Sequence, residues 1–360
     1  MKLDRITSLL DDPGPFATAY AEVSRAQEDG DTLAELAARA AHDELVDQGA
    51  PASVAEQVRD RLAASTHRPA PVSRCVVASE RGVLLDELTA VHRAHPRHTW
   101  DVLPDLAEWV QDASLVVPYV LALVDHQGGK VQTFADGGPQ PDREAEVTDD
   151  SDHVQRVSAG GWSQARWQRS TEEVWARNAG EVVEEIRRQV TNGPSLLVLA
   201  GDVRSRQLVE GELQNLPADV VQLDRGGRAE DGGDEALENE IREVLRGQLI
   251  ASRLDRLHEL GQQLGRGDRM AVGVRDVAEA FVRGQVDTLY LDPVQSAEHE
   301  LEPGAYPGLA FGAVQVTGPV QADRALIAAA CLTDADVVTA GTEHLFGTPV
   351  AAVLRWNQAG

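Results

Sequence analysis

The chain has 360 residues, of which 42% are hydrophobic, and a formal net charge of −26. This length predicts two or three domains, each with a core of its own. The acidic balance argues against a generic nucleic-acid-binding protein, whose domains are normally basic, but it leaves room for contact with RNA through one local basic patch. No run approaches the roughly 20 apolar residues of a membrane span, and the N-terminus lacks the apolar stretch of a signal peptide. We therefore expect a soluble, cytoplasmic protein.

The first expected domain covers residues 1–112 and mixes helices with strands. A strand pattern at 16–23 precedes two helical patterns, at 31–46 and 51–62, and the first of these has apolar residues at helical spacing. The second helical pattern has a proline in its first turn, where a missing N–H is tolerated. Two short apolar runs then flank residues 79–82, which is a hairpin signal. This order indicates an α+β domain.

Neither the cysteines nor the histidines predict a metal centre. Cys75 and Cys331 are far apart in sequence and belong to no motif, so we expect two ordinary core thiols. Three histidines invite a metal hypothesis, but Pro96 breaks the helix that would align them, and no carboxylate or thiolate completes a ligand set at a familiar spacing. They are His92, His95 and His98, which we expect to be surface histidines. No metal and no other cofactor is expected.

The second expected domain covers residues 113–235. Residues 119–124 are continuously apolar, which predicts a strand buried on both faces, and 130–134 predict a returning strand after a glycine turn. The segment 136–152 is rich in Asp and Glu and contains glycines and prolines, so we expect a solvated, mobile loop. Two further strands are predicted, at 196–200 and 220–223.

A glycine-rich turn before a long helix is the most informative stretch of this domain. Gly160 and Gly161 can adopt backbone angles that other residues avoid, so they can form an exposed turn. Ser163 is a suitable N-cap for a helix that runs to about residue 190. The side chains at the tip of this turn would be Trp162 and Gln164.

Three arginines of the same helix fall near one stripe, which is interrupted by Glu173. They are Arg166, Arg169 and Arg177. Such a stripe fits a charged helix entrance that reaches into a partner, and it fits equally an amphipathic helix with ordinary surface charges. Spacing alone does not decide between the two.

The strand at 196–200 is followed by Gly201 and Asp202, which open the next helix. Such a step can bind phosphate at the helix N-terminus. The sequence has a single glycine here, no Gly-x-Gly-x-x-Gly and no Walker lysine, so we expect a plain βα turn.

The third expected domain covers residues 236–360 and follows a flexible Gly-rich linker at 225–234. Helical patterns alternate with strand patterns, which predicts an α/β sandwich. The helices are expected at 235–264, 274–281 and 322–330, and the strands at 286–291, 336–339 and 350–354.

Three domains in this order resemble the archaeal and eukaryotic class-1 release factors and their relative Pelota. Gly160-Gly161-Trp162-Ser163-Gln164-Ala165-Arg166-Trp167 falls where those factors carry Gly-Gly-Gln-Ser-Ala-x-Arg-Phe, at unchanged spacing. Residues 273–291 and 345–355 resemble two further runs of the same family. The resemblance covers roughly residues 113–360, and the first domain shows no Asn-Ile-Lys-Ser stop-codon motif.

The resemblance implies a fold and a set of partners. It implies a ribonuclease-H-like middle domain aimed at the peptidyl-transferase centre, a first domain at the decoding centre, and a ribosomal-protein-like α/β sandwich as the third domain. The bacterial relatives include the Balon-type ribosome hibernation factors, for which the translation GTPase is EF-Tu. The implied partners are the ribosomal A site with its rRNA, EF-Tu and, as an open alternative, tRNA; no membrane and no DNA are implied.

Trp162 is the main departure from the family. In release factors the corresponding glutamine helps to place the water that hydrolyses peptidyl-tRNA, and an indole cannot copy the paired donor and acceptor of an amide. A tryptophan at a loop tip can instead stack on a nucleobase, which is worth about 1–3 kcal/mol. We therefore predict a factor that occupies the A site of idle or stalled ribosomes without releasing peptide. Its predicted rRNA-binding residues are Gly160, Gly161, Trp162, Ser163, Gln164, Arg166, Arg169 and Arg177.

Two other hypotheses stay open. Gly161-Trp162-Ser163-Gln164 also matches Gly-x-x-Gln, the motif of peptidyl-tRNA hydrolases that share this middle domain; Gln164 would then be catalytic and the protein would rescue stalled ribosomes. In the third hypothesis the protein acts in stress with an unrelated protein partner and does not bind ribosomes.

Overall fold

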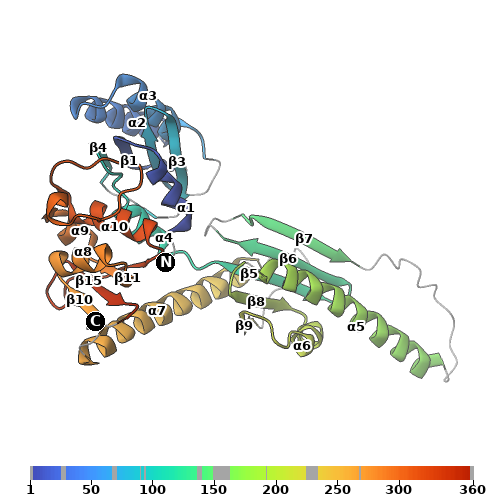
Figure 1. The fold of residues 1–360 in the computed structure, drawn as a ribbon. Coiled ribbons are helices and arrows are strands. Elements are labelled where there is room, and N and C mark those ends of the chain that lie inside the picture. Colours follow the sequence, from blue (N-terminus) through green and yellow to red (C-terminus); the bar gives the residue numbers. More distant parts are fainter. Residues whose placement is uncertain are drawn as a thin grey trace. The chain divides into compact units, whose positions relative to one another are not determined.

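The structure is a computed structural model that contains two compact units (Figure 1). It describes residues 3–25, 30–66, 71–89, 91–92, 95–135, 140–148, 163–191, 193–223, 234–266 and 269–356. One unit combines Met1–Leu115 with Ser252–Gly360, and the other is Val116–Ala251. The boundary falls inside the long helix α7 (Asp234–Arg266). The predicted mixed α/β and α+β architecture is confirmed, whereas the division into three domains stays a prediction.

The N-terminal part of the first unit is an antiparallel sheet with the order β3–β2–β1–β4. Alternate residues of β1 face opposite sides, as the period of a strand requires: Ala17 and Ala19 pack under the helices, while Phe16 and Tyr20 belong to another cluster. The strands are β1 (Phe16–Glu22), β2 (Ser73–Ser79), β3 (Gly82–Thr89) and β4 (Arg97–Asp101), and the covering helices are α2 (Gly30–Asp47) and α3 (Ala52–Ala63).

The C-terminal part of the first unit has a second sheet, with the order β10–β15–β11–β14, in which only β11 and β14 are parallel. The strands are β10 (Met270–Val272), β11 (Val286–Leu291), β14 (Asp336–Thr339) and β15 (Val350–Leu354). Leu257 and Leu260 of α7 pack against one face of this sheet. The helices α8 (Val274–Val282) and α10 (Ala322–Leu332) contribute to a second cluster with residues of the other face. The minor elements here are α9 (Pro293–Ala297), β12 (Glu300–Leu301), η2 (Pro303–Ala305) and β13 (Val320–Gln321).

The two sheets of the first unit share one hydrophobic cluster. Tyr20 and Trp109, both fully buried, belong to the same cluster as Leu289 and Leu326 of the C-terminal part. Three small helices from the N-terminal part join it: α1 (Asp4–Thr7), η1 (Ser8–Asp11) and α4 (Ala107–Ala113). Residues from both ends of the chain therefore fold as one body.

An ion cluster accompanies this shared core. Arg324 of α10 is 6% exposed and pairs with Asp101 and Asp105, the latter at 3.3 Å. Arg97 also pairs with Asp105, at 2.7 Å. The neighbouring Asp323 is fully buried, and neither of its carboxylate oxygens accepts a hydrogen bond from any described residue.

The second unit is a five-stranded sheet with the order β7–β6–β5–β8–β9 (Figure 1). The strand β5 pairs antiparallel with β6 and parallel with β8. The strands are β5 (Tyr119–Asp125), β6 (Gly128–Phe134), β7 (Arg143–Thr148), β8 (Leu196–Gly201) and β9 (Asp219–Gln222). The helices α5 (Ser163–Val190) and α6 (Val203–Glu212) pack on one face, and the start of α7 packs on the other. The specific likeness to ribonuclease H stays a prediction.

The long helix α7 could be mistaken for a membrane span on length alone. The helix α7 has 33 residues, but charged side chains recur throughout it. Within the described ranges, no helix is both long and apolar enough to cross a membrane.

The predicted loop over 136–152 is wrong in part, because it contains β7. This strand pairs with β6 along its whole length. Ala145 and Val147 alternate with Glu144 and Glu146, so the segment has the period of a strand despite its acidic composition. Glu144 interacts with Lys130 at 3.0 Å, and hydrogen bonding holds the pKa of its carboxyl group below the usual value, with Gln132 as the leading donor. Composition suggested a loop, and the alternation was the better signal.

The prediction of three surface histidines is wrong for His98. It lies in β4, is 4% exposed, and its Nδ1 lies 2.8 Å from a carboxylate oxygen of Glu44. His92 and His95 are exposed as predicted, and His92 pairs with Glu22. The strand that holds His98 was not predicted, since Pro96 directly before it suggested only a break. Both cysteines are free and buried, which confirms the prediction for Cys75 and Cys331.

We expect Asp323→Asn to stabilise the first unit above pH 6. Burial, and then the nearby Asp105 carboxylate, raise the pKa of Asp323 to about 6 from 3.8. The folded state therefore binds the proton more tightly than the unfolded state, so stability falls by about 3 kcal/mol in total as pH rises from about 4 to about 6, and stays lower above that. Urea unfolding at several pH values should show that the free energy of unfolding of the variant rises relative to that of the wild type as pH increases over this range. Glu302→Gln, at an exposed carboxyl group, is the control; an equal response from both variants would contradict the assignment.

Candidate functional site

The helix α5 is the element that positions the predicted site. Its buried residues, among those whose side chains are described, run from Asn178 to Val190 and pack on β5, β6 and β8. The helix approaches β6 closely, since a Cβ added to Gly129 would lie 3.0 Å from a methyl group of Val182. Figure 1 shows the N-terminal part of α5 continuing beyond the edge of the sheet. The sheet therefore holds α5 at its C-terminal end.

The predicted site residues fall into three groups in the structure. Gly160, Gly161 and Trp162 lie outside the described residues. The backbone of α5 begins at Ser163, as the sequence predicted to within one residue, and it includes positions 164, 166 and 169, whose side chains are not described. Arg177 is described and exposed. The predicted roles of Ser163, Gln164, Arg166 and Arg169 in binding rRNA stay predictions, as does that of Arg177.

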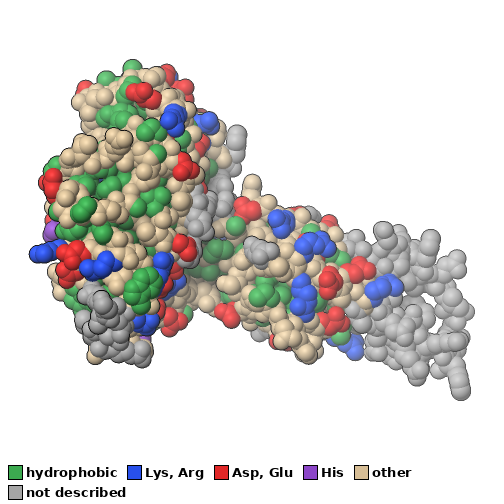
Figure 2. All heavy atoms as spheres, viewed as in Figure 1, with side chains coloured by type: hydrophobic (Ala, Val, Ile, Leu, Met, Phe, Trp, Pro, Cys, Tyr) green, Lys and Arg blue, Asp and Glu red, His purple; other side chains and the backbone are tan. Residues whose placement is uncertain are grey.

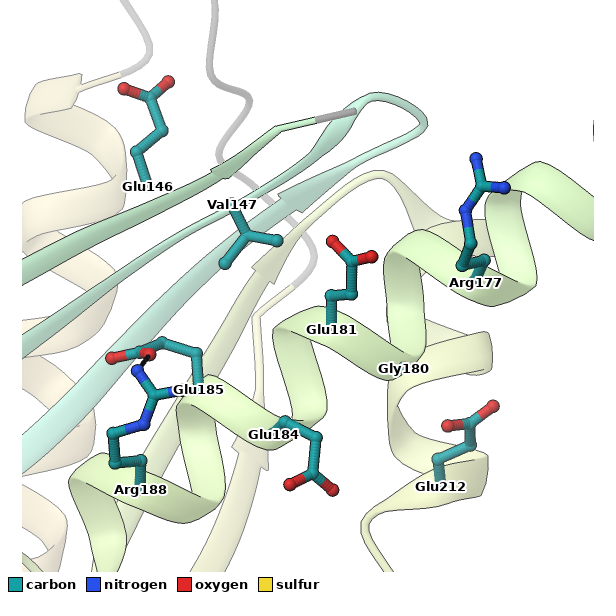
Figure 3. Close-up of a pocket in the computed structure, with 9 residues that line it drawn as sticks. All are labelled: Glu146, Val147, Arg177, Gly180, Glu181, Glu184, Glu185, Arg188 and Glu212. Carbon is teal, nitrogen blue, oxygen red and sulfur yellow. Dashed lines mark hydrogen bonds and ion pairs between the residues drawn. The ribbon is translucent and has the colours of Figure 1, made fainter. Parts of the chain in front are cut away.

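Arg177 lines a groove that the sequence analysis missed (Figure 3). The groove has a volume of about 740 Å³ and lies along the exposed face of α5, between β7 and the end of α6. Figure 3 shows Glu181 on the β7 side of the helix and Glu184 on the side of Glu212. The lining residues are Glu146, Val147, Arg177, Gly180, Glu181, Glu184, Glu185, Arg188 and Glu212. The recurrence of glutamates at 181, 184 and 185 was the sequence signal that could have revealed it.

The groove is acidic on balance, with five glutamates and two arginines. Arg188 pairs with Glu185, a residue that is 6% exposed. The other carboxylate oxygen of Glu185 accepts a hydrogen bond from Gln189 at 2.8 Å, and Gln189 in turn accepts from Thr133 of β6. This network fixes the C-terminal end of α5 to the sheet. A surplus of carboxylates repels phosphate groups, so the described part of α5 does not resemble an RNA-binding face.

The described surface of the second unit also mixes acidic and basic side chains. In the view of Figure 2, Lys and Arg side chains alternate with Asp and Glu side chains over its described part, without a continuous basic patch. Within the described ranges there is also no group of three or more His, Cys, Asp or Glu side chains that could hold a metal ion.

The step from β8 to α6 is a capped turn, as predicted. Gly201 has a φ of 118°, and a Cβ at this position would lie 2.0 Å from the carbonyl oxygen of Val124. Asp202 is the N-cap, and its carboxylate accepts hydrogen bonds from the backbone N–H groups of Arg204 and Ser205 at 3.0 and 3.1 Å. These bonds, with that of Ser205 strongest, hold the pKa of the Asp202 carboxyl group below its usual value. The carboxylate occupies the place that a bound phosphate would need.

The comparison with protein families gives one match. Residues 118–266 match the model of bacterial archaeo-eukaryotic release factor family 2. This segment begins at the start of β5, ends with α7, and contains the whole Gly160–Arg169 stretch. Residues 118–266 are therefore similar to the bacterial archaeo-eukaryotic release factors, and the match does not extend to residues 1–117 or 267–360.

The solved structures that match this chain include Pelota and Dom34 proteins. Pelota of Archaeoglobus fulgidus is 16% identical, with 82% of this chain and 83% of that chain covered and a TM-score of 0.34. The archaeal Pelota in a model of ribosome-bound Pelota and ABCE1 is 16% identical, with coverages of 98% and 93% and a TM-score of 0.41. Saccharomyces cerevisiae Dom34, a termination-like factor that interacts with Hbs1, is 9% identical, with both coverages at 80% and a TM-score of 0.41. Likenesses at this level do not establish a common function. No curated protein is similar enough to count as a match.

We expect Gly201→Ala to destabilise the second unit by about 2–4 kcal/mol. The added methyl group collides with the β5 backbone at a φ that alanine avoids, and a backbone carbonyl in a central strand cannot move away. Gly211→Ala is the matched control, since its Cβ would meet nothing within 4 Å and it lies in α6. The control should be neutral or slightly stabilising. Chemical denaturation of both variants tests this, and equal stability would show that the turn is not a fixed constraint.

Proposed function

We propose that this protein is a ribosome-binding translation factor that occupies the A site of idle or stalled ribosomes without releasing peptide. The observation that carries the proposal is Trp162, which stands in a release-factor segment at the position where the family has its water-positioning glutamine. An indole N–H donates one hydrogen bond and accepts none, so it cannot orient a nucleophilic water as an amide does. A ring that size at a loop tip can stack on a base.

The length of α5 supports the proposal. A helix of 28 residues spans about 42 Å, and Figure 1 shows the N-terminal part of α5 continuing beyond the edge of the sheet. The segment that precedes Ser163 is thus joined directly to the end of a rigid rod. Such a rod can carry a loop into a narrow site that the body of the protein does not enter.

The distribution of charge also supports it. The acidic groove along residues 177–188 repels phosphate, while Arg166 and Arg169 lie on the first turns of the same helix. Contact with rRNA would therefore be limited to the N-terminal end of α5. Such a limited contact would allow a chain with a net charge of −26 to bind RNA. A role in hibernation or stress, binding to EF-Tu, contact with tRNA and a first domain at the decoding centre belong to the same proposal.

Trp162→Ala should weaken binding to vacant ribosomes by roughly tenfold or more, because one base stack is lost. Arg166→Ala should weaken binding and reduce its salt dependence by about one phosphate contact. Co-sedimentation with purified ribosomes at several salt concentrations measures both effects. Arg204→Ala removes an exposed arginine of the same unit away from the tip, so it serves as the control. Unchanged affinity in both tip variants would rule out the loop as the anchor.

The rival function is peptidyl-tRNA hydrolysis by Gln164, which lies in the first turn of α5 and within the matched segment. We expect no release of peptide from ribosome-bound peptidyl-tRNA at saturating protein, because Trp162 replaces the catalytic amide. Release that is lost in Gln164→Ala and retained in Trp162→Ala would establish the rival function instead. The binding assay above shows independently whether each variant reaches the ribosome.

A further inference from the structure

The C-terminal part of the first unit has an unusual charge pattern. Between residues 284 and 354 the sequence contains a single Lys or Arg, and this residue, Arg324, is buried in the ion cluster with Asp101 and Asp105. The same stretch holds nine acidic residues: Asp287, Asp292, Glu298, Glu300, Glu302, Asp323, Asp334, Asp336 and Glu343. The surface contributed by this stretch therefore carries no exposed Lys or Arg of its own, which is unfavourable for binding nucleic acid.

Two large apolar side chains project from this surface. Val294 of α9 is 67% exposed, and Phe346, in the turn between β14 and β15, is 41% exposed. Asp292 ties the two segments together: one carboxylate oxygen accepts from the backbone N–H of Val294 at 3.0 Å, and the other accepts from that of Thr342 at 3.0 Å. We call this the Asp292 surface; it consists of residues 292–298 and 341–349.

Phe346 is held out at a conformational cost. Its φ of 61° lies in the left-handed region, which bulky residues avoid. The turn is fixed on both sides, because Leu345 is fully buried and the N–H of Gly347 donates to the carbonyl of Thr342 at 2.9 Å. A glycine would suit this backbone angle better than a bulky residue does. Strain of this kind is a reason to look for a binding role.

On the Asp292 surface, the charged side chains around Val294 and Phe346 are mainly acidic. Glu298, the C-cap of α9, lies one turn after Val294, and both Glu298 and Glu343 are exposed. Nε2 of His344 lies 3.6 Å from a carboxylate oxygen of Glu343. Arg253 of α7, which donates to the carbonyl of Thr339 at 3.4 Å, lies at the border of the surface. The arrangement has an apolar centre and an acidic rim, which is the anatomy of a protein interface.

We propose that the Asp292 surface binds a basic protein of the ribosome, with Val294 and Phe346 entering an apolar pocket that is bordered by Lys or Arg. Charge complementarity favours this occupant over rRNA, because the charged side chains on the surface are mainly carboxylates, which repel a phosphate backbone. The inference rests on the proposed function, since it assumes that the protein reaches the ribosome. It adds a second contact of opposite character to that proposed for the tip of α5: the α5 tip would bind RNA, and the Asp292 surface would bind protein.

Photocrosslinking tests the proposal on the full-length chain. A benzophenone amino acid replaces Phe346, the protein is bound to vacant ribosomes, and the adduct is identified after irradiation. We expect an adduct with a basic ribosomal protein. The same probe at Trp356, which is 51% exposed and lies outside the surface, should not give that adduct. Three outcomes would overturn this inference alone, provided that the protein binds ribosomes saturably: an adduct with rRNA, an adduct with EF-Tu when EF-Tu is added, or no adduct. Absence of binding would overturn the proposed function and this inference together.

Substitutions give the matching affinity measurement. Phe346→Gly and Val294→Ser should each weaken ribosome binding by roughly tenfold, as expected for central anchors of an interface. Phe346→Gly should leave the thermal midpoint unchanged or raised, because glycine accepts the left-handed backbone. Val282→Ser, at another exposed position of the C-terminal part, should leave affinity unchanged. Wild-type affinity for both surface variants would overturn the inference.

Discussion

The pairing of Arg324 with Asp101 and Asp105 is the constraint on which the first unit depends. A guanidinium group that is 6% exposed must have anionic partners, because an isolated buried charge costs far more than folding can supply. Removing one partner of such a pair typically costs 3–5 kcal/mol. The partners here come from segments more than 200 residues apart, so the ion cluster is satisfied only when the two ends of the chain fold together. The shared apolar cluster then closes around it.

Electrostatics also organises the rest of the chain. The chain is strongly acidic, and its described surfaces keep that character both in the groove on α5 and on the Asp292 surface. A protein of this kind is repelled by nucleic acid over most of its area and can approach it only where cations gather. The first turns of α5 are such a place in the sequence. In the proposed function, the acidic surplus would restrict the orientation of binding, and the arginines of these turns would supply the contact.

Much of the fold could be predicted from the sequence because its core strands are strongly patterned. The apolar runs that became β5, β8, β11 and β15, and the long period of α5 and α7, are signals that tertiary context seldom overrides. The failures have specific causes. The composition of residues 136–152 concealed the alternation of β7, and Pro96 concealed the strand that buries His98 against Glu44. The groove on α5 was missed because its lining comes from three elements, which only tertiary packing brings together.

The candidate site stays a prediction, because the side chains at the tip of α5 are not described. It depends on the identity of Trp162, which lies within the segment that matches the release factor family. That match ends with the last residue of α7, whereas the compact units divide this helix in the middle. The matched segment therefore includes its own attachment, since Leu257 and Leu260 of α7 pack on Tyr290 and Val353 of the C-terminal sheet.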